Sequence, residues 1–135
     1  MTPEERAAGV VVGSAVGDAL GAPFEFGPPG AFTARFPISG HGAERGDEMC
    51  GGGGWEPGEA TDDTQMAVLV ADSLLQRGSL DLADMFRRFQ RWAVSDPKDI
   101  GIQTEQVLTS SLGWERAAAH HFETTRRAAG NGALM

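Results

Sequence analysis

Three polar residues, Thr61, Asp62 and Asp63, stand directly before a segment whose apolar residues recur at helical spacing. From Met66 onward an apolar residue returns at every fourth position, so residues 61–77 predict an amphipathic helix. Threonine is favoured just before a helix, because its hydroxyl accepts a hydrogen bond from an unpaired backbone N–H. The three residues therefore predict the start of the clearest helix in the chain.

Two interpretations of these residues stay open at this point. In the first, Thr61 only caps the helix, and Asp62 and Asp63 occupy the first turn because the helix dipole favours negative charge there. In the second, one hydroxyl and two carboxylates gather oxygen ligands on a rigid element, as a hard cation such as Mg²⁺ requires. The surrounding chain has to decide between a cap and a metal site.

The other periodic segments also predict helices, and no alternating run predicts a strand. The predicted helices cover residues 3–20, 80–94, 103–112 and 114–128. Only Gly78 and Ser79 connect the helix over 61–77 to the next one, so we expect these two helices to pack antiparallel. The predicted fold class is all-α, in one compact helical domain over residues 1–135.

The first predicted helix carries two unusual features. Gly9, Gly13 and Gly17 form a row, and each costs a helix about 1 kcal/mol relative to alanine, so we expect a neighbouring helix or a ligand to pack against them. Asp18 falls near the C-terminal end, where the dipole disfavours a carboxylate. This position suggests a function for Asp18, and a surface aspartate in a fraying last turn is the alternative.

Residues 21–60 form a long segment rich in glycine and proline, far beyond the usual length of a connection. Its phenylalanines argue against disorder, because they give the segment something to bury. Glu25, between Phe24 and Phe26, is the carboxylate that we expect near a site, and an ordinary exposed glutamate is the alternative. We interpret the segment as an active-site loop.

Composition excludes several classes of function. A net charge of −8 disfavours nucleic acid and acidic membrane surfaces as partners, and no apolar run is expected to reach the ~20 residues that span a bilayer. Cys50 is the single cysteine, which favours a reducing, cytoplasmic location. The glycine run 51–54 lacks the Gly-Lys-Ser/Thr that a phosphate-binding P-loop requires.

Four segments together resemble the ADP-ribosylglycohydrolase family, which includes the dinitrogenase-reductase-activating glycohydrolases. They are residues 13–25 (GSAVGDALGAPFE), 61–66 (TDDTQM), 99–101 (DIG) and 130–135 (GNGALM). The resemblance implies an all-helical domain holding two Mg²⁺ ions, with Mn²⁺ as a substitute, that hydrolyses the bond between ADP-ribose and a modified protein or small molecule at the ribose C1″.

The resemblance also implies roles for individual residues. Thr61, Asp62 and Asp63 would ligate the metal pair, with Asp62 and Glu25 as the catalytic residues. The substrate-binding residues would be Asp99, Gly130, Asn131 and Gly132. The bond that is cleaved (arginine, serine, acetyl ester or another linkage) is not implied.

Three protein oxygens do not complete two octahedral metal sites. The family supplies further ligands from a later Asp-x-Asp-Thr segment, which this sequence lacks. We therefore expect an incomplete, N-terminal part of the domain, completed by a C-terminal fragment of the same protein or by self-association. The alternative function is a non-catalytic binding or structural module with the same helical scaffold.

Overall fold

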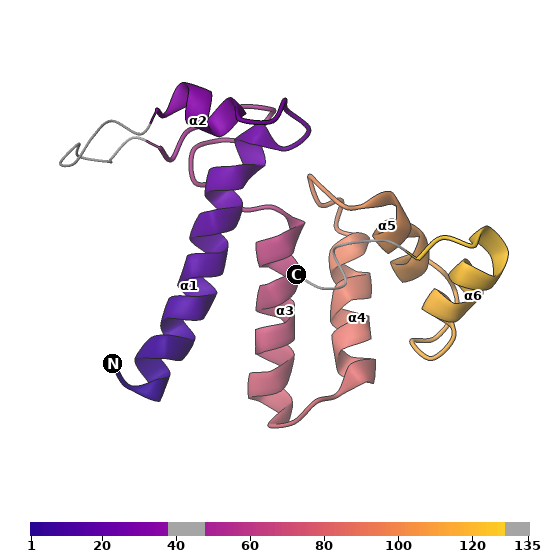
Figure 1. Cartoon of the computed structure of the whole chain (residues 1–135). Coiled ribbons are helices and arrows are strands. Elements are labelled where there is room, and N and C mark those ends of the chain that lie inside the picture. Colours follow the sequence, from indigo (N-terminus) through magenta and orange to yellow (C-terminus); the bar gives the residue numbers. More distant parts are fainter. Residues whose placement is uncertain (38–47, 129–135) are drawn as a thin grey trace. The chain divides into compact units, whose positions relative to one another are not determined.

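The structure is a computed structural model in which residues 1–37 and 48–128 are described. Within these ranges the chain is helical and forms no strand, apart from one isolated bridge, so the predicted all-α class is confirmed. Contacts divide the chain into two compact units, Met1–Thr61 and Asp62–Met135. Figure 1 shows the helices of both units, and each unit is considered by itself below.

The first unit begins with α1 (Pro3–Gly21), which has a complete set of start signals. The Thr2 hydroxyl accepts a hydrogen bond from the Glu5 N–H at 3.1 Å, and the Glu5 carboxylate accepts one from the Thr2 N–H at 2.7 Å. This reciprocal capping box satisfies two N–H groups that the helix leaves unpaired. Pro3 at the first position loses nothing, because its missing N–H would have no partner there. The predicted helix over residues 3–20 is confirmed.

Most of the surface of α1 is exposed, including its apolar residues. Val10, Val11 and Val12 are between 58% and 72% exposed. By length and composition the segment Pro3–Phe24 reaches what a membrane span needs, so the expectation that no apolar run approaches that length is wrong. Core helices of soluble proteins and N-terminal signal sequences have the same length and composition, so one such helix is weak evidence for a membrane span.

No described residue packs closely on the glycine row of α1, contrary to the expected contact with a neighbouring helix. Among residues 1–37 and 48–128, no atom lies within 4 Å of a Cβ built on Gly9, Gly13 or Gly17. We therefore expect Gly13→Ala to raise the helix stability by about 1 kcal/mol, because alanine loses less backbone entropy than glycine and nothing obstructs its methyl group. Thermal unfolding followed by circular dichroism measures the change, and a lower melting temperature would mean that a partner packs on this row.

The segment over residues 21–60 contains more regular structure than its composition predicted. A 3₁₀ turn, η1 (Ala22–Phe24), follows α1 directly, and α2 (Ala31–Arg35) is a short helix beyond Gly30. The rings of Phe24, Phe32 and Phe36 lie 5.3–6.3 Å apart in edge-on and tilted arrangements. This aromatic cluster gives the segment a small core of its own, as the phenylalanine content indicated.

The glycine run forms a tight turn rather than a phosphate-binding loop. Gly52 and Trp55 exchange backbone hydrogen bonds of 3.0 and 2.9 Å across Gly53 and Gly54. These two glycines have φ angles of +61° and +98°, in the region that side chains disfavour. The backbone geometry of this turn is therefore sufficient to account for glycine at these two positions.

The second unit consists of α3 (Asp62–Arg77), α4 (Leu82–Ala93), α5 (Ile102–Leu108) and α6 (Ala117–Thr125). α3 and α4 pack antiparallel, as the short connection predicted, and α4 contacts α5, which contacts α6 (Figure 1). The last two helices are shorter than predicted. α6 ends because Arg126 adopts a left-handed conformation with φ +58°.

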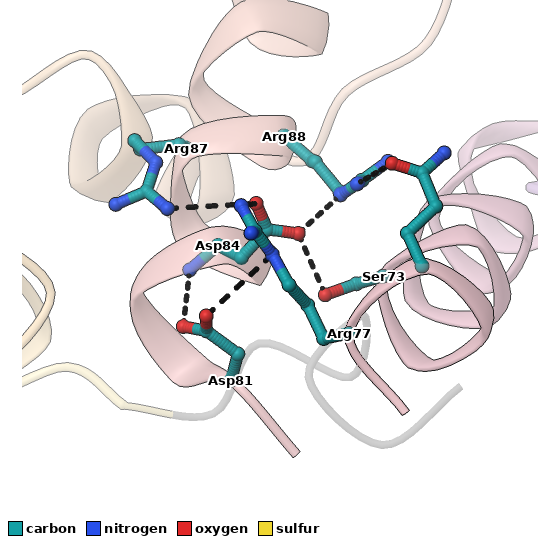
Figure 2. A network of polar contacts seen from close by, with 7 residues as sticks. Ser73, Arg77, Asp81, Asp84, Arg87 and Arg88 are labelled. Carbon is teal, nitrogen blue, oxygen red and sulfur yellow. Dashed lines mark hydrogen bonds and ion pairs between the residues drawn. The ribbon is translucent and has the colours of Figure 1, made fainter. Parts of the chain in front are cut away.

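A buried carboxylate links α3 to α4 (Figure 2). Asp84 is 3% exposed, and it accepts hydrogen bonds from Ser73 Oγ at 2.9 Å, Arg77 Nη2 at 2.6 Å and Arg88 Nε at 2.6 Å. The bonds from Arg77 and then Arg88 hold the pKa of the Asp84 carboxyl well below its usual range. We call these four residues the Asp84 network.

Two further side-chain bonds order the second unit. The Asp81 carboxylate accepts the Asp84 N–H at 2.8 Å and caps α4. The Trp92 indole N–H donates to Gln65 Oε1 at 2.7 Å, which ties α4 to the first turn of α3.

Candidate functional site

The hydroxyl and the backbone of Thr61 are both held by one carboxylate. Within the first unit, Thr61 N–H donates to Asp18 Oδ2 at 2.9 Å, and the Thr61 hydroxyl donates to Asp18 Oδ1 at 2.7 Å. Thr61 is 4% exposed, and Asp18 is half-buried in the last turn of α1. Because the hydroxyl proton is directed at Asp18, any other partner of the Thr61 oxygen has to be a hydrogen-bond donor or a cation.

The start of α3 lies against the segment that precedes α5 in the second unit. Partial burial raises the pKa of the Asp62 carboxyl above its usual value, and the charge of Asp99 raises it further. Backbone hydrogen bonds at Asp62 itself, Gly101 and Asp63 oppose this rise. The fold thus brings together two of the predicted site residues, Asp62 and Asp99, which are 37 positions apart in the sequence.

The remaining predicted site residues lie at the start of α3, in the first unit, or outside the described residues. Asp63 is half-buried at the second position of α3. Glu25 belongs to the first unit, where it is exposed directly after η1, and its N–H donates to the Ala22 carbonyl at 3.3 Å. The next residue, Phe26, has a φ of +60° and is 96% exposed. The predicted substrate residues Gly130, Asn131 and Gly132 lie outside the described residues.

The oxygen ligands suit a hard cation but do not enclose one. Asp62 and Asp99 repel each other, and a divalent cation near them would relieve that repulsion. In the first unit, considered by itself, the Thr61 hydroxyl donates its proton to Asp18, which leaves lone pairs on the oxygen. Among residues 1–37 and 48–128, no group of three or more His, Cys, Asp or Glu side chains is arranged to hold a metal ion. Carboxylate and hydroxyl oxygens are the donor type that Mg²⁺ takes.

Two contributors to this region were not assigned to it by sequence reasoning. Asp18 gave a signal, a carboxylate against the dipole at a helix C-terminus, but its partner Thr61 is 43 residues away and no local pattern predicts that pair. Gly101 contributes through its backbone to Asp62, and backbone contacts leave no trace in side-chain chemistry. The contact of Asp18 with Thr61 and that of Gly101 with Asp62 are evident only in the fold.

Known proteins match the chain over its whole length. The family model described as ADP-ribosylglycohydrolase matches residues 1–135. An ADP-ribosyl-[dinitrogen reductase] glycohydrolase of Rhodospirillum rubrum is 36% identical over 97% of this chain and 42% of its own length. ADP-ribosylarginine hydrolases named Tri1 from Serratia proteamaculans and Pseudomonas putida are each 31% identical, over 97% and 100% of this chain.

The chain spans less than half of each of these relatives, between 34% and 42% of their lengths. The matched residues nevertheless include α1, the residues before α3 and the segment before α5, which carry the motifs from which the resemblance was inferred. The match over all 135 residues confirms that inference: this chain belongs to the ADP-ribosylglycohydrolase family.

Proposed function

We propose that this protein is a Mg²⁺-dependent hydrolase that removes ADP-ribose from a modified protein by cleaving the bond at the ribose C1″. The observation that carries the proposal is the approach of Asp62, at the start of α3, to Asp99, before α5. A cation and the hydroxyl groups of a sugar would both stabilise two half-buried carboxylates whose charges repel each other. Membership of the family supports the reaction class.

In this proposal Thr61, Asp62 and Asp63 provide protein oxygens for two Mg²⁺ ions, which Mn²⁺ would also satisfy. When bound, the ions supply Lewis-acid stabilisation of the ribose oxygens beside the bond that breaks. Asp99 accepts hydrogen bonds from the substrate, and Gly130, Asn131 and Gly132 line the ADP-ribose.

Glu25 and Asp62 are the two carboxylates that act beside the reacting bond in this scheme, Asp62 through the metal ions that it holds. Glu25 is exposed on a short turn, where a carboxylate is able to reach a substrate without a cost of burial. We assign the two carboxylates as the catalytic residues of this chain.

The first substrate to test is an ADP-ribosylated arginine in a protein, because two relatives are named for that linkage. We also propose that the remaining metal ligands come from a second segment, either a C-terminal fragment of the same protein or a second copy of this chain. The single cysteine, Cys50, is consistent with a reducing cytoplasmic compartment.

The second candidate is a non-catalytic module that binds ADP-ribose without turnover. It is favoured by one observation, namely that the described carboxylates do not complete a metal site. The interaction of Asp62 with Asp99 favours the enzyme, because a pure scaffold gains nothing from carboxylates that repel each other.

An assay of ADP-ribose release separates these candidates. The protein, alone and mixed with the C-terminal segment, is incubated with an ADP-ribosylarginine protein in Mg²⁺, in Mn²⁺ and in excess EDTA, and free ADP-ribose is measured by chromatography. We expect release with either metal, none with EDTA, and recovery when Mg²⁺ is restored. Binding of ADP-ribose in calorimetry without release under any of these conditions would establish the non-catalytic module instead.

A further inference from the structure

The contact between Asp18 and Thr61 is more specific than a helix cap or a surface hydrogen bond. Both polar hydrogens of one residue are donated to both oxygens of one carboxylate, at 2.9 and 2.7 Å, over a sequence separation of 43. Thr61 is 4% exposed, so water does not compete freely for these bonds. The contact fixes the backbone and the side chain of Thr61 at the same time.

The position of Asp18 has an electrostatic cost that the contact offsets. A carboxylate in the last turn of α1 faces the negative end of the helix dipole. Hydrogen bonds to a charged acceptor are the stronger kind, which explains how this carboxylate is tolerated. An uncharged side chain could accept hydrogen bonds from Thr61 without repulsion by the negative end of the helix dipole. The negative charge of Asp18 therefore needs a separate physical explanation.

That explanation is found in the direction of the Thr61 hydroxyl proton. The hydroxyl proton of a threonine rotates about the Cβ–Oγ1 bond, and the hydrogen bond to Asp18 fixes that proton toward the carboxylate. The oxygen then presents only lone pairs to its other side. A neighbouring negative charge also increases the electron density on the hydroxyl oxygen, which strengthens it as a cation ligand.

We propose that Asp18 is a positioning residue that orients the hydroxyl of Thr61 toward a divalent cation. Asp18 does not touch the ion in this scheme and acts only through Thr61. The proposal rests on the proposed function, in that it assumes a cation beside Thr61, Asp62 and Asp63. It adds Asp18, a residue of α1, to the consecutive residues Thr61, Asp62 and Asp63.

Binding of Mn²⁺ alone, titrated by electron paramagnetic resonance, tests the proposal. Asp18→Asn keeps the shape and one acceptor oxygen but loses the charge, and we expect it to weaken Mn²⁺ binding about 10- to 100-fold, the usual effect of removing a residue that orients a metal ligand. Glu4→Gln is the matched control, because it removes the same charge from an exposed position in the first turn of α1. It should leave the Mn²⁺ affinity within about twofold of the parent.

A double-mutant cycle separates positioning from a general effect on folding. In a Thr61→Ala background, Asp18→Asn should change the Mn²⁺ affinity by less than about twofold, because the residue through which Asp18 acts is gone. Far-UV circular dichroism and the melting temperature show whether each variant is folded. Asp18→Ala, which also removes the acceptor, should weaken binding at least as much as Asp18→Asn.

The outcomes distinguish this inference from the function on which it rests. If the parent binds no Mn²⁺, the proposed metal site fails and the inference fails with it. If the parent binds Mn²⁺ and folded Asp18→Asn binds it equally well, only the positioning role is overturned. The positioning role is also overturned if Asp18→Asn weakens Mn²⁺ binding by the same factor in the parent and in the Thr61→Ala background.

Discussion

Replacing Asp62 or Asp63 by alanine is expected to weaken Mg²⁺ and Mn²⁺ binding by more than about 100-fold. Removal of residues that merely orient a metal ligand costs 10- to 100-fold, so removal of the ligand itself should cost at least as much. If the two aspartates only stabilised the first turn of α3, each would contribute about 0.3–1 kcal/mol to the helix and nothing to an ion. Isothermal titration calorimetry with each metal measures the difference.

Asp72→Asn is the control for this experiment, because it removes a half-buried carboxylate further along the same helix. Its metal affinity should stay within about twofold of the parent, since a charge more than a helical turn or two away is largely screened. Should Asp62→Ala and Asp63→Ala both bind metal as the parent does, the two aspartates are helix-capping residues and the metal assignment is wrong.

Replacing Asp84 by alanine is expected to cause the largest loss of stability in the second unit. The variant leaves Arg88, whose side chain is 11% exposed, and the fully buried hydroxyl of Ser73 without their acceptor. Breaking a buried pair by removing one partner is strongly destabilising, because the other charge stays uncompensated. We expect the melting temperature to fall by more than about 10 °C, measured by circular dichroism or calorimetry.

The neighbouring Arg87 provides the comparison. It also approaches Asp84, but at 3.5 Å and with a side chain that is 54% exposed. Exposed ion pairs contribute little, so Arg87→Ala should shift the melting temperature by no more than about 3 °C. Equal losses from Asp84→Ala and Arg87→Ala would show that the Asp84 network does not hold α3 to α4 in the way that the distances indicate.

The Asp84 network also predicts how stability depends on pH. The pKa of this carboxyl is lowered in the folded state from an ordinary value of 3.8. Below that ordinary value the unfolded chain takes up a proton that the folded chain does not, so acid favours unfolding. The contribution of Asp84 is therefore complete above about pH 5 and is lost progressively below about pH 4. Urea unfolding at several pH values should show a steeper acid loss for the parent than for Asp84→Asn.

The main helices could be predicted because their ends carry local signals. Pro3, Asp62 and Asp81 mark helix starts, and Gly78 marks the end of α3 with φ +67°. Such signals act within one turn and need no tertiary contact. The short elements η1 and α2 were not predicted, because they depend on the packing of three phenylalanine rings rather than on periodicity.

Only part of the candidate site could be predicted, because local signals identify consecutive residues but not contacts between residues far apart in the sequence. The consecutive residues Thr61, Asp62 and Asp63 are visible in any reading of the sequence. The pairing of Thr61 with Asp18 depends on the path of the chain through residues 19–60, which no local rule describes. The motif that includes Asp99 identified that residue, and its approach to Asp62 required the fold.

The bond from the Trp92 indole to Gln65 makes the second unit spectroscopically useful. Gln65 lies three residues after Asp62, in the turn where an ion would be held, and indole fluorescence responds to changes at its N–H. The sequence contains no tyrosine and three tryptophans, so Trp55→Phe and Trp114→Phe together would leave Trp92 as the single emitter. Such a protein would carry its own fluorescent probe of the start of α3, read without any attached label.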